Sequence, residues 1–164
     1  MIPTPTLSAL EAMSPRQAGA LLAQARALQH AARTGSTQPL LKGKNLGLLC
    51  EAEDQPDAAL FRRAAHALGA HVAHIRPSLT ELSTPQEVRH TARMLGRLYD
   101  AVECQGMAAA VVRQVGANAG VPVYDGIALR SHPSARLAEQ LEGGGSTADK
   151  RLFVLQALLL NTIG

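Results

Sequence analysis

Short apolar runs alternate along this chain with longer segments in which apolar residues recur every three or four positions. Each short run ends within two residues of a Gly, a Pro or an acidic residue, as strands buried on both faces do. The pattern predicts strands over residues 45–50, 71–75, 101–104 and 121–124.

The longer segments predict helices, and the first of them carries clear boundary signals. Ser14 followed by Pro15 indicates an N-cap and a first helical turn, and Gly35 ends the same helix. The last helix is unusually apolar and follows a Gly-rich stretch. The helical pattern covers residues 15–34, 56–68, 85–98, 107–119, 133–141 and 149–162.

Strands that alternate with long helices favour a parallel sheet with right-handed crossovers. The expected fold class is therefore α/β: three α/β/α layers around a four-stranded parallel sheet, with the long N-terminal and C-terminal helices packed on it. We expect one domain over residues 1–164, with a core over 1–141, a Gly-rich bridge over 142–148 and the terminal helix over 149–163.

Composition and charge narrow the classes of partner. The net charge of +3 is mildly basic, but Lys and Arg are scattered and aromatic residues make up only 2% of the chain, so no nucleic-acid partner is expected. The N-terminus has no basic, apolar leader, and no segment has the length of a membrane span. We therefore expect a cytoplasmic protein without membrane contact.

Cysteine and histidine give no sign of a metal site. Cys50 and Cys104 lie in apolar runs, and two cysteines are not a disulfide framework in a domain of this size, so buried free thiols are expected. The histidines are dispersed over different elements, and His71 and His74, three apart on a strand, point to opposite faces. We expect no metal and no cofactor.

A series of motifs, in a fixed order, resembles the aspartate and ornithine carbamoyltransferases. The motifs stand in their predicted strand, loop and helix contexts, which makes the resemblance more specific than any one of them. The matching positions are residues 41–44, Phe61, Leu68, Gly69, His71, residues 91–95, Asp100, residues 121–123, Gly126, His132 and Pro133. Residues 148–158 resemble the last helix of the family, which crosses back from its second domain onto the first.

This resemblance implies the carbamoyl-phosphate-binding half of the family, through which its members form trimers. It also implies that the second, amino-acid-binding domain is missing between Leu141 and Ala148. We expect a homo-oligomer, with a trimer favoured, and an unknown small-molecule ligand. Residues 80–84 lack the Gly-Arg-Gly-Glu pattern with which the family reaches a neighbouring active site, which places a shared site in doubt.

The family's phosphate-binding residues are replaced here. The positions of its Ser-x-Arg-Thr-Arg motif hold Asp54, Gln55, Pro56, Asp57 and Ala58, and Gln105 takes the place of a third arginine. A charge-assisted hydrogen bond contributes about 1.5 to 3 kcal/mol, so losing three arginines removes roughly 5 to 9 kcal/mol of binding free energy. The family's reaction, carbamoyl transfer to an amino-acid amine, is therefore not expected, which favours a non-catalytic or regulatory domain.

Other interpretations of the same residues stay open. Asp54 and Asp57 can cap and charge-complement their own helix instead of forming a catalytic pair. His132, which is left from the family's His-Pro-x-Gln motif, can support its loop. It can also join Arg130 and Arg136 in a cleft with an altered ligand, in a binder or enzyme of amino-acid or carbamoyl metabolism. A further alternative is that another polypeptide supplies the second domain.

Overall fold

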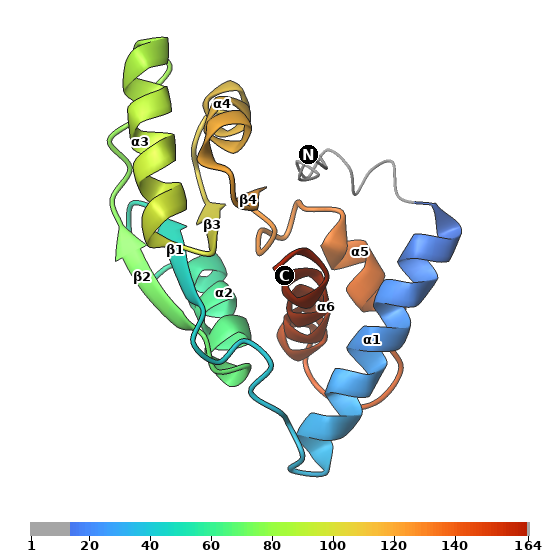
Figure 1. Cartoon of the computed structure of the whole chain (residues 1–164). Helices are drawn as coiled ribbons and strands as arrows, with labels where there is room; N and C mark the ends of the chain where they lie inside the picture. Colours follow the sequence, from blue (N-terminus) through green and yellow to red (C-terminus); the bar gives the residue numbers. More distant parts are fainter. Residues whose placement is uncertain (1–13, 164) are drawn as a thin grey trace.

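The computed structural model describes residues 14–163 of the chain (Figure 1). The expectations for the first thirteen residues, that they belong to the same domain and contain no leader, lie outside this range. In chain order the elements are α1 (Pro15–Arg33), β1 (Asn45–Leu49), α2 (Pro56–Ala67), β2 (His71–Ile75), α3 (Pro85–Leu98), β3 (Ala101–Cys104), α4 (Ala109–Ala119), β4 (Val123–Asp125), α5 (Ser134–Glu139) and α6 (Thr147–Thr162).

The four strands form one parallel sheet in the order β2-β1-β3-β4, which confirms the predicted fold class. Leu46 of β1 is paired with Val72 on one side and with Ala101 on the other. Because all strands run the same way, their carboxyl ends meet at one edge of the sheet. That edge is where open α/β sheets bind ligands.

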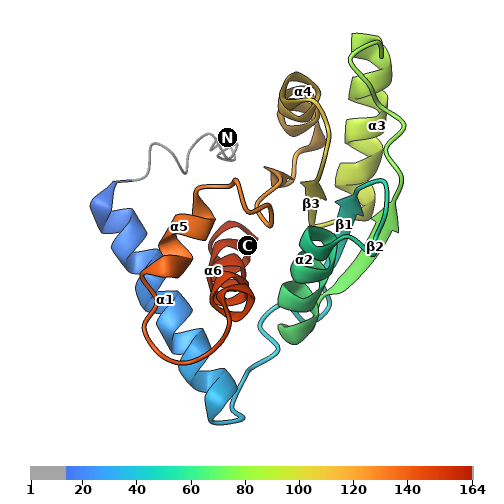
Figure 2. The ribbon, with the colours of Figure 1, turned by 180° about the vertical axis from the view of Figure 1, so that it is seen from behind.

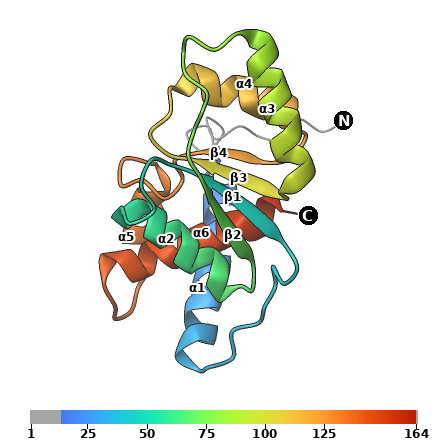
Figure 3. The ribbon, with the colours of Figure 1, turned by 90° about the vertical axis from the view of Figure 1, so that its left-hand side faces the viewer.

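Alternating side chains of the strands serve two separate cores. Leu46 and Leu48 face α2 and α6, and Leu49 and Val102 face α3 and α4 on the opposite side. Figure 3 shows the layers in order: α3 with α4, then the sheet, then α2 with α6. The strands are apolar on both faces because helices cover both faces.

The two long terminal helices occupy different layers. α6 packs directly on the sheet, as expected, whereas α1 packs mainly on α6 and α5, through a third core that contains Leu21, Leu158 and Leu141. α1 and α5 therefore form an outer layer beyond α6, as the view from behind also shows (Figure 2). The expectation that α1 packs on the sheet needs this correction.

Capping decides where several helices begin. Ser14 is the N-cap of α1, as predicted, and it forms a capping box with Gln17. α6 begins at Thr147, two residues earlier than predicted, because Ser146 and Asp149 form a second capping box. The predicted Gly-rich bridge is shortened accordingly at its C-terminal end.

Gly and Pro account for the later starts of two other elements. α4 begins at Ala109 instead of 107, after Gly106 has turned the chain with a φ of 76°. β4 begins at Val123 instead of 121, because Pro122 has no amide hydrogen to donate to the ladder. Cys50 and Cys104 are buried and free, as predicted, and burial raises the pKa of both thiols.

Candidate functional site

A surface cleft of about 480 Å³ lies at the carboxyl end of the sheet, between the first turn of α2 and the loop that follows β4. The residues that line it are Pro56, Asp57, Leu129, Arg130 and Ser131. The replaced motif and the loop bearing His132 therefore do meet in space. This is the candidate site.

The first turn of α2 forms one wall of the cleft and has no side-chain cap. Gln55 is the N-cap residue in extended conformation, Pro56 opens the helix, and no side chain bonds to the free amides of the first turn. The expectation that Asp54 and Asp57 cap this helix is therefore wrong. Asp54 is exposed, and Asp57 complements the helix only by the sign of its charge.

Asp57 instead faces a buried arginine from α6. Arg151 is only 9% exposed, and its Nη2 lies 3.7 Å from Oδ1 of Asp57. The same guanidinium nitrogen donates a hydrogen bond to the backbone carbonyl of Ala128. The cation behind the cleft is thus already neutralised by a carboxylate of the same chain.

The side chain of Gln105 is bonded to other residues of the same chain. It is buried, and its Nε2 donates to the backbone carbonyl of Asp57 at 3.2 Å and to Oε2 of Glu103 at 3.3 Å. Both bonds hold the start of α2 against β3. Its amide nitrogen is therefore occupied within the chain.

Glu103 supports the loop after β4 from within the sheet. Its carboxylate accepts hydrogen bonds from the backbone amides of Ile127 and Ala128, each at 3.1 Å. The side chain is fully buried, and burial raises its pKa to about 8, against the opposing effect of these hydrogen bonds. Glu103 thus fixes the backbone whose next residues line the cleft.

His132 is buried behind the cleft. Its Nδ1 accepts a hydrogen bond from the backbone amide of Ser134 at 3.1 Å, and the Ser134 hydroxyl donates to the carbonyl of Ile127. Burial lowers the pKa of the imidazole to about 4, so it is neutral near pH 7 and carries its proton on Nε2. Nε2 is buried without a partner among the described residues. These bonds support the loop-supporting interpretation of His132.

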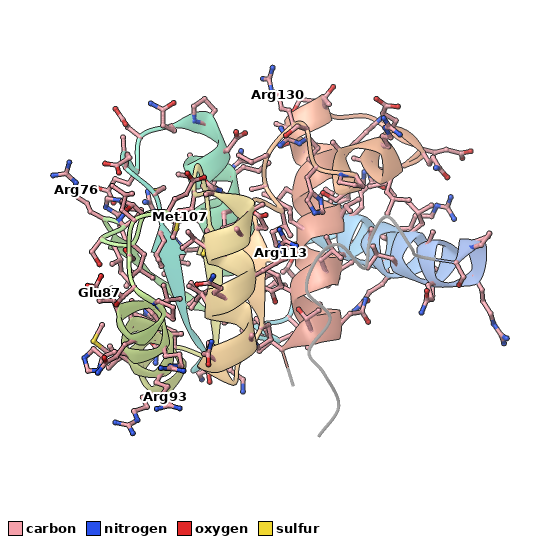
Figure 4. All side chains as sticks on the ribbon, turned by 90° about the horizontal axis from the view of Figure 1, so that it is seen from above. Arg76, Glu87, Arg93, Met107, Arg113 and Arg130 are labelled. Atoms are coloured by element: carbon pink, nitrogen blue, oxygen red, sulfur yellow. The ribbon has the colours of Figure 1, made fainter. Side chains whose placement is uncertain are left out.

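The three expected cleft residues do not converge. Arg130 lines the cleft but is exposed, and its side chain points away from the molecule in Figure 4. Arg136 is exposed on α5 and is not among the lining residues, and His132 is buried. Within residues 14–163, no cluster of three or more His, Cys, Asp or Glu is arranged to hold a metal ion.

Sequence reasoning missed Glu103 and Arg151. Each has a signal in the sequence: Glu103 interrupts an apolar strand, and Arg151 begins the strongly apolar part of the last helix. A charged residue in such a run is expected to be paired when it is buried. Asp57 lies far from Arg151 in sequence, and the backbone amides of Ile127 and Ala128 lie far from Glu103, so the pattern alone did not identify these contacts.

Comparison with known proteins identifies the family. Residues 6–142 match the family model described as "Aspartate/ornithine carbamoyltransferase, carbamoyl-P binding domain". The ornithine carbamoyltransferase of Cutibacterium acnes is 40% identical over 121 residues, which are 74% of this chain and 36% of that protein. A catabolic ornithine carbamoyltransferase of Pseudomonas putida is 36% identical over 135 residues, 82% of this chain and 40% of that protein. The chain thus spans little more than a third of the length of these relatives.

Solved structures of ornithine carbamoyltransferases also resemble this chain. Ornithine carbamoyltransferase from Gloeobacter violaceus superposes with a TM-score of 0.60 at 28% identity, over 82% of this chain and 42% of that one. The enzyme from Pyrococcus furiosus gives a TM-score of 0.70 at 24% identity, over 83% and 44%, which supports the fold alone. The chain therefore belongs to the aspartate/ornithine carbamoyltransferase family and matches the model of its carbamoyl-P binding domain.

Proposed function

We propose that this chain is a non-catalytic domain of the carbamoyltransferase family. The observation that carries the proposal is the ion pair between Asp57 and Arg151 at the first turn of α2. If the family resemblance holds at this site, a bound phosphate group would lie at this turn. In this chain the carboxylate of Asp57 occupies that position instead and supplies the negative charge.

Electrostatics argue against a bound phosphate. The free amides at a helix start attract anions, but Asp57 places a carboxylate in this first turn and Asp54 places another just before the N-cap residue. Gln105 carries no charge, and its amide nitrogen is already bonded within the chain. Ala58 is completely buried, so an arginine at that position would have to enter the core. Repulsion by these carboxylates and the absence of the guanidinium groups both weaken phosphate binding.

Chemistry at the reacting carbonyl would fail for a related reason. His132 keeps a proton on Nε2 for donation to a carbonyl oxygen, but that nitrogen is buried behind the cleft. An oriented donor accelerates a reaction only when the substrate is held against it. Without a phosphate anchor, His132 has no positioned substrate.

A thermal-shift titration with carbamoyl phosphate tests the proposal. We expect no rise in melting temperature at about 10 mM ligand, whereas a ligand at a hundred times its Kd stabilises by about 2.7 kcal/mol. An ornithine carbamoyltransferase serves as the positive control. Stabilisation of the wild-type chain by carbamoyl phosphate would overturn the proposal.

The role of Asp57 is tested separately. Asp57→Asn removes the charge and leaves Arg151 without its counterion, so we expect phosphate binding to increase measurably in calorimetry. Glu139→Gln is the matched control, because Glu139 is exposed and lies outside the cleft. Equal binding by both variants would show that Asp57 does not block the site.

We propose further that the chain is a homo-oligomer, with a trimer favoured, and that the bridge after α5 replaces the second domain. In support, Leu82 is 94% exposed in the loop before α3, where a large apolar side chain is unfavourable without a partner. Light scattering should give three times the chain mass, and Leu82→Ser should lower it. A monomer at all concentrations would contradict the trimer.

One observation favours the alternative function, in which the cleft binds a different small ligand. Asp57 and Arg130 line the cleft with opposite charges, and a small zwitterion such as an amino acid would contact both if the exposed Arg130 side chain turned back over the cleft. A screen of amino acids by the same thermal-shift method would find such a ligand. The prediction for this alternative is that Arg130→Gln abolishes the shift.

A further inference from the structure

The outer face of α3 carries two parallel rows of exposed side chains. Arg89, Arg93 and Arg97 follow one another every fourth residue and form a basic row. Met94 and Leu98, which are 47% and 59% exposed, form an apolar row beside it. The opposite face of the helix is buried through Val88, Ala92 and Leu95.

The basic row has no counterion. Within residues 14–163, none of Arg89, Arg93 and Arg97 has a hydrogen bond or an ion pair. Like charges one helical turn apart destabilise a helix, so the row works against the helix that carries it. Exposed apolar side chains beside it are unfavourable in water as well. A partner with an acidic row and an adjoining apolar row would reduce both the repulsion between the arginines and the exposure of the apolar side chains.

Among residues 14–163, no helix or strand covers this face. α3 lies at the outside of the molecule beside α4 (Figures 1 and 3), and the side chains of both rows are exposed. The Arg93 side chain extends away from the protein (Figure 4). The face is therefore accessible along the length of the helix.

We propose that the outer face of α3 binds an acidic amphipathic helix of another protein. Carboxylates spaced one turn apart on that helix pair with the arginine row, and an adjoining row of apolar side chains covers Met94 and Leu98. This surface is separate from the cleft at α2, so the proposal goes beyond the non-catalytic function and does not depend on it.

Two other occupants fit less well. A second copy that placed its own α3 here about a two-fold axis would bring the arginine rows together. Nucleic acid would meet a basic row of only about 12 Å, from Arg89 to Arg97 at 1.5 Å per residue, with apolar side chains beside it. The apolar row specifically favours an amphipathic protein partner.

Fluorescence anisotropy with a labelled synthetic peptide tests the proposal. The peptide is a helix of about 18 residues with Glu in one i, i+4 row and Leu in the adjacent row. We expect Arg93→Glu to weaken its binding at least about tenfold and Met94→Ser to weaken it several-fold. Arg26→Glu, at an exposed position of α1, is the matched control and should leave binding unchanged.

Stability serves as an independent readout. Arg93→Glu places a carboxylate one turn from both Arg89 and Arg97, so its melting temperature should rise by about 1 to 3 °C while binding is lost. That combination separates a lost surface from a lost fold.

Several outcomes would overturn the proposal. They are absence of peptide binding, equal binding of a scrambled peptide of the same composition, and equal binding by the Arg93→Glu variant. Stronger binding of a single-stranded oligonucleotide would identify a nucleic-acid surface instead. Self-association that Arg93→Glu abolishes would identify a second copy as the occupant.

Discussion

Two buried titratable residues near the cleft respond to burial in opposite ways. Burial raises the pKa of Glu103 to about 8, so the native state binds a proton that the unfolded state has released. Burial lowers the pKa of His132 to about 4, so the unfolded state binds a proton that the native state has released. Between about pH 4.5 and 6.5 these effects on the free energy of unfolding cancel.

Of these two residues, only Glu103 changes the free energy of unfolding above pH 6.5, because His132 is then neutral in both the native and the unfolded state. The free energy of unfolding should fall by about 1 kcal/mol per pH unit up to about pH 8. Chemical denaturation at a series of pH values measures this. Glu103→Gln should remove the fall above pH 6.5 and expose a rise from pH 4 to 6.5 caused by His132. An unchanged profile in that variant would exclude Glu103 as the source.

Arg151 should contribute more to stability than its surface counterparts. Arg151→Met keeps most of the apolar stem of the side chain but leaves the Ala128 carbonyl and the Asp57 carboxylate without their partner. We expect a loss of about 2 kcal/mol in urea denaturation, reduced by the partial exposure of Asp57.

The control is Arg63→Met, because Arg63 and Asp149 form an ion pair in which both side chains are about half exposed. Such a pair is worth roughly 1 kcal/mol at most. Equal losses in the two variants would show that Arg151 has no special role.

For single residues, the location in the fold was easier to predict from the sequence than the side-chain contacts. The sequence resemblance predicted Asp57 and Gln105 as replaced site positions; Asp57 lines the cleft, and Gln105 donates a hydrogen bond to its backbone carbonyl. The pairing of Asp57 with Arg151 joins two elements far apart in sequence, and local patterns carry no information about it. The capping role expected for Asp57 failed for the same reason.

Among the elements, α3 and α4 make the tightest crossing at a glycine. A Cβ on Gly96 would lie 1.8 Å from the backbone carbonyl oxygen of Ala119. Gly96→Ala should therefore push the helices apart and cost about 2 kcal/mol or more of unfolding free energy. Thermal denaturation measures the loss.

Gly19 of α1 provides the opposite case. Nothing lies within 4 Å of a Cβ built there, so Gly19→Ala should stabilise the protein by about 0.5 to 1 kcal/mol. A loss of stability in this variant would mean that helix propensity does not govern the position.

The ten elements themselves were predictable because strands and helices differ in hydrophobic period and carry Pro, Gly and Ser at their ends. The misplaced boundaries depend on hydrogen bonds instead of hydrophobicity. α6 starts earlier because Ser146 and Asp149 bond to each other, and β4 starts later because Pro122 lacks a donor. The packing of α1 on α6 could not be predicted either, because an apolar face on a helix does not indicate which element it packs against.

In the whole molecule, α6 belongs to two of the three cores. Leu155 and Leu159 pack with the sheet and α2, while Val154 and Leu158 pack with α1 and α5. Tyr124 of β4 is also hydrogen-bonded to Thr162 of α6. Deleting residues 142–164 should therefore abolish cooperative unfolding and the near-ultraviolet signal of Tyr124, and should increase binding of a hydrophobic dye. A cooperative transition in the truncated chain would contradict this.

The place of α6 also has a consequence during synthesis. Every other described element leaves the ribosome before it, and the core shared by the sheet, α3 and α4 needs no residue from it. The opposite face of the nascent sheet, which contains Leu46 and Leu48, is not covered by α6 until that helix has been synthesised. Until the last helix emerges, that apolar face is open to chaperones and to aggregation, so slow translation near the bridge would prolong the most vulnerable stage of this protein's life.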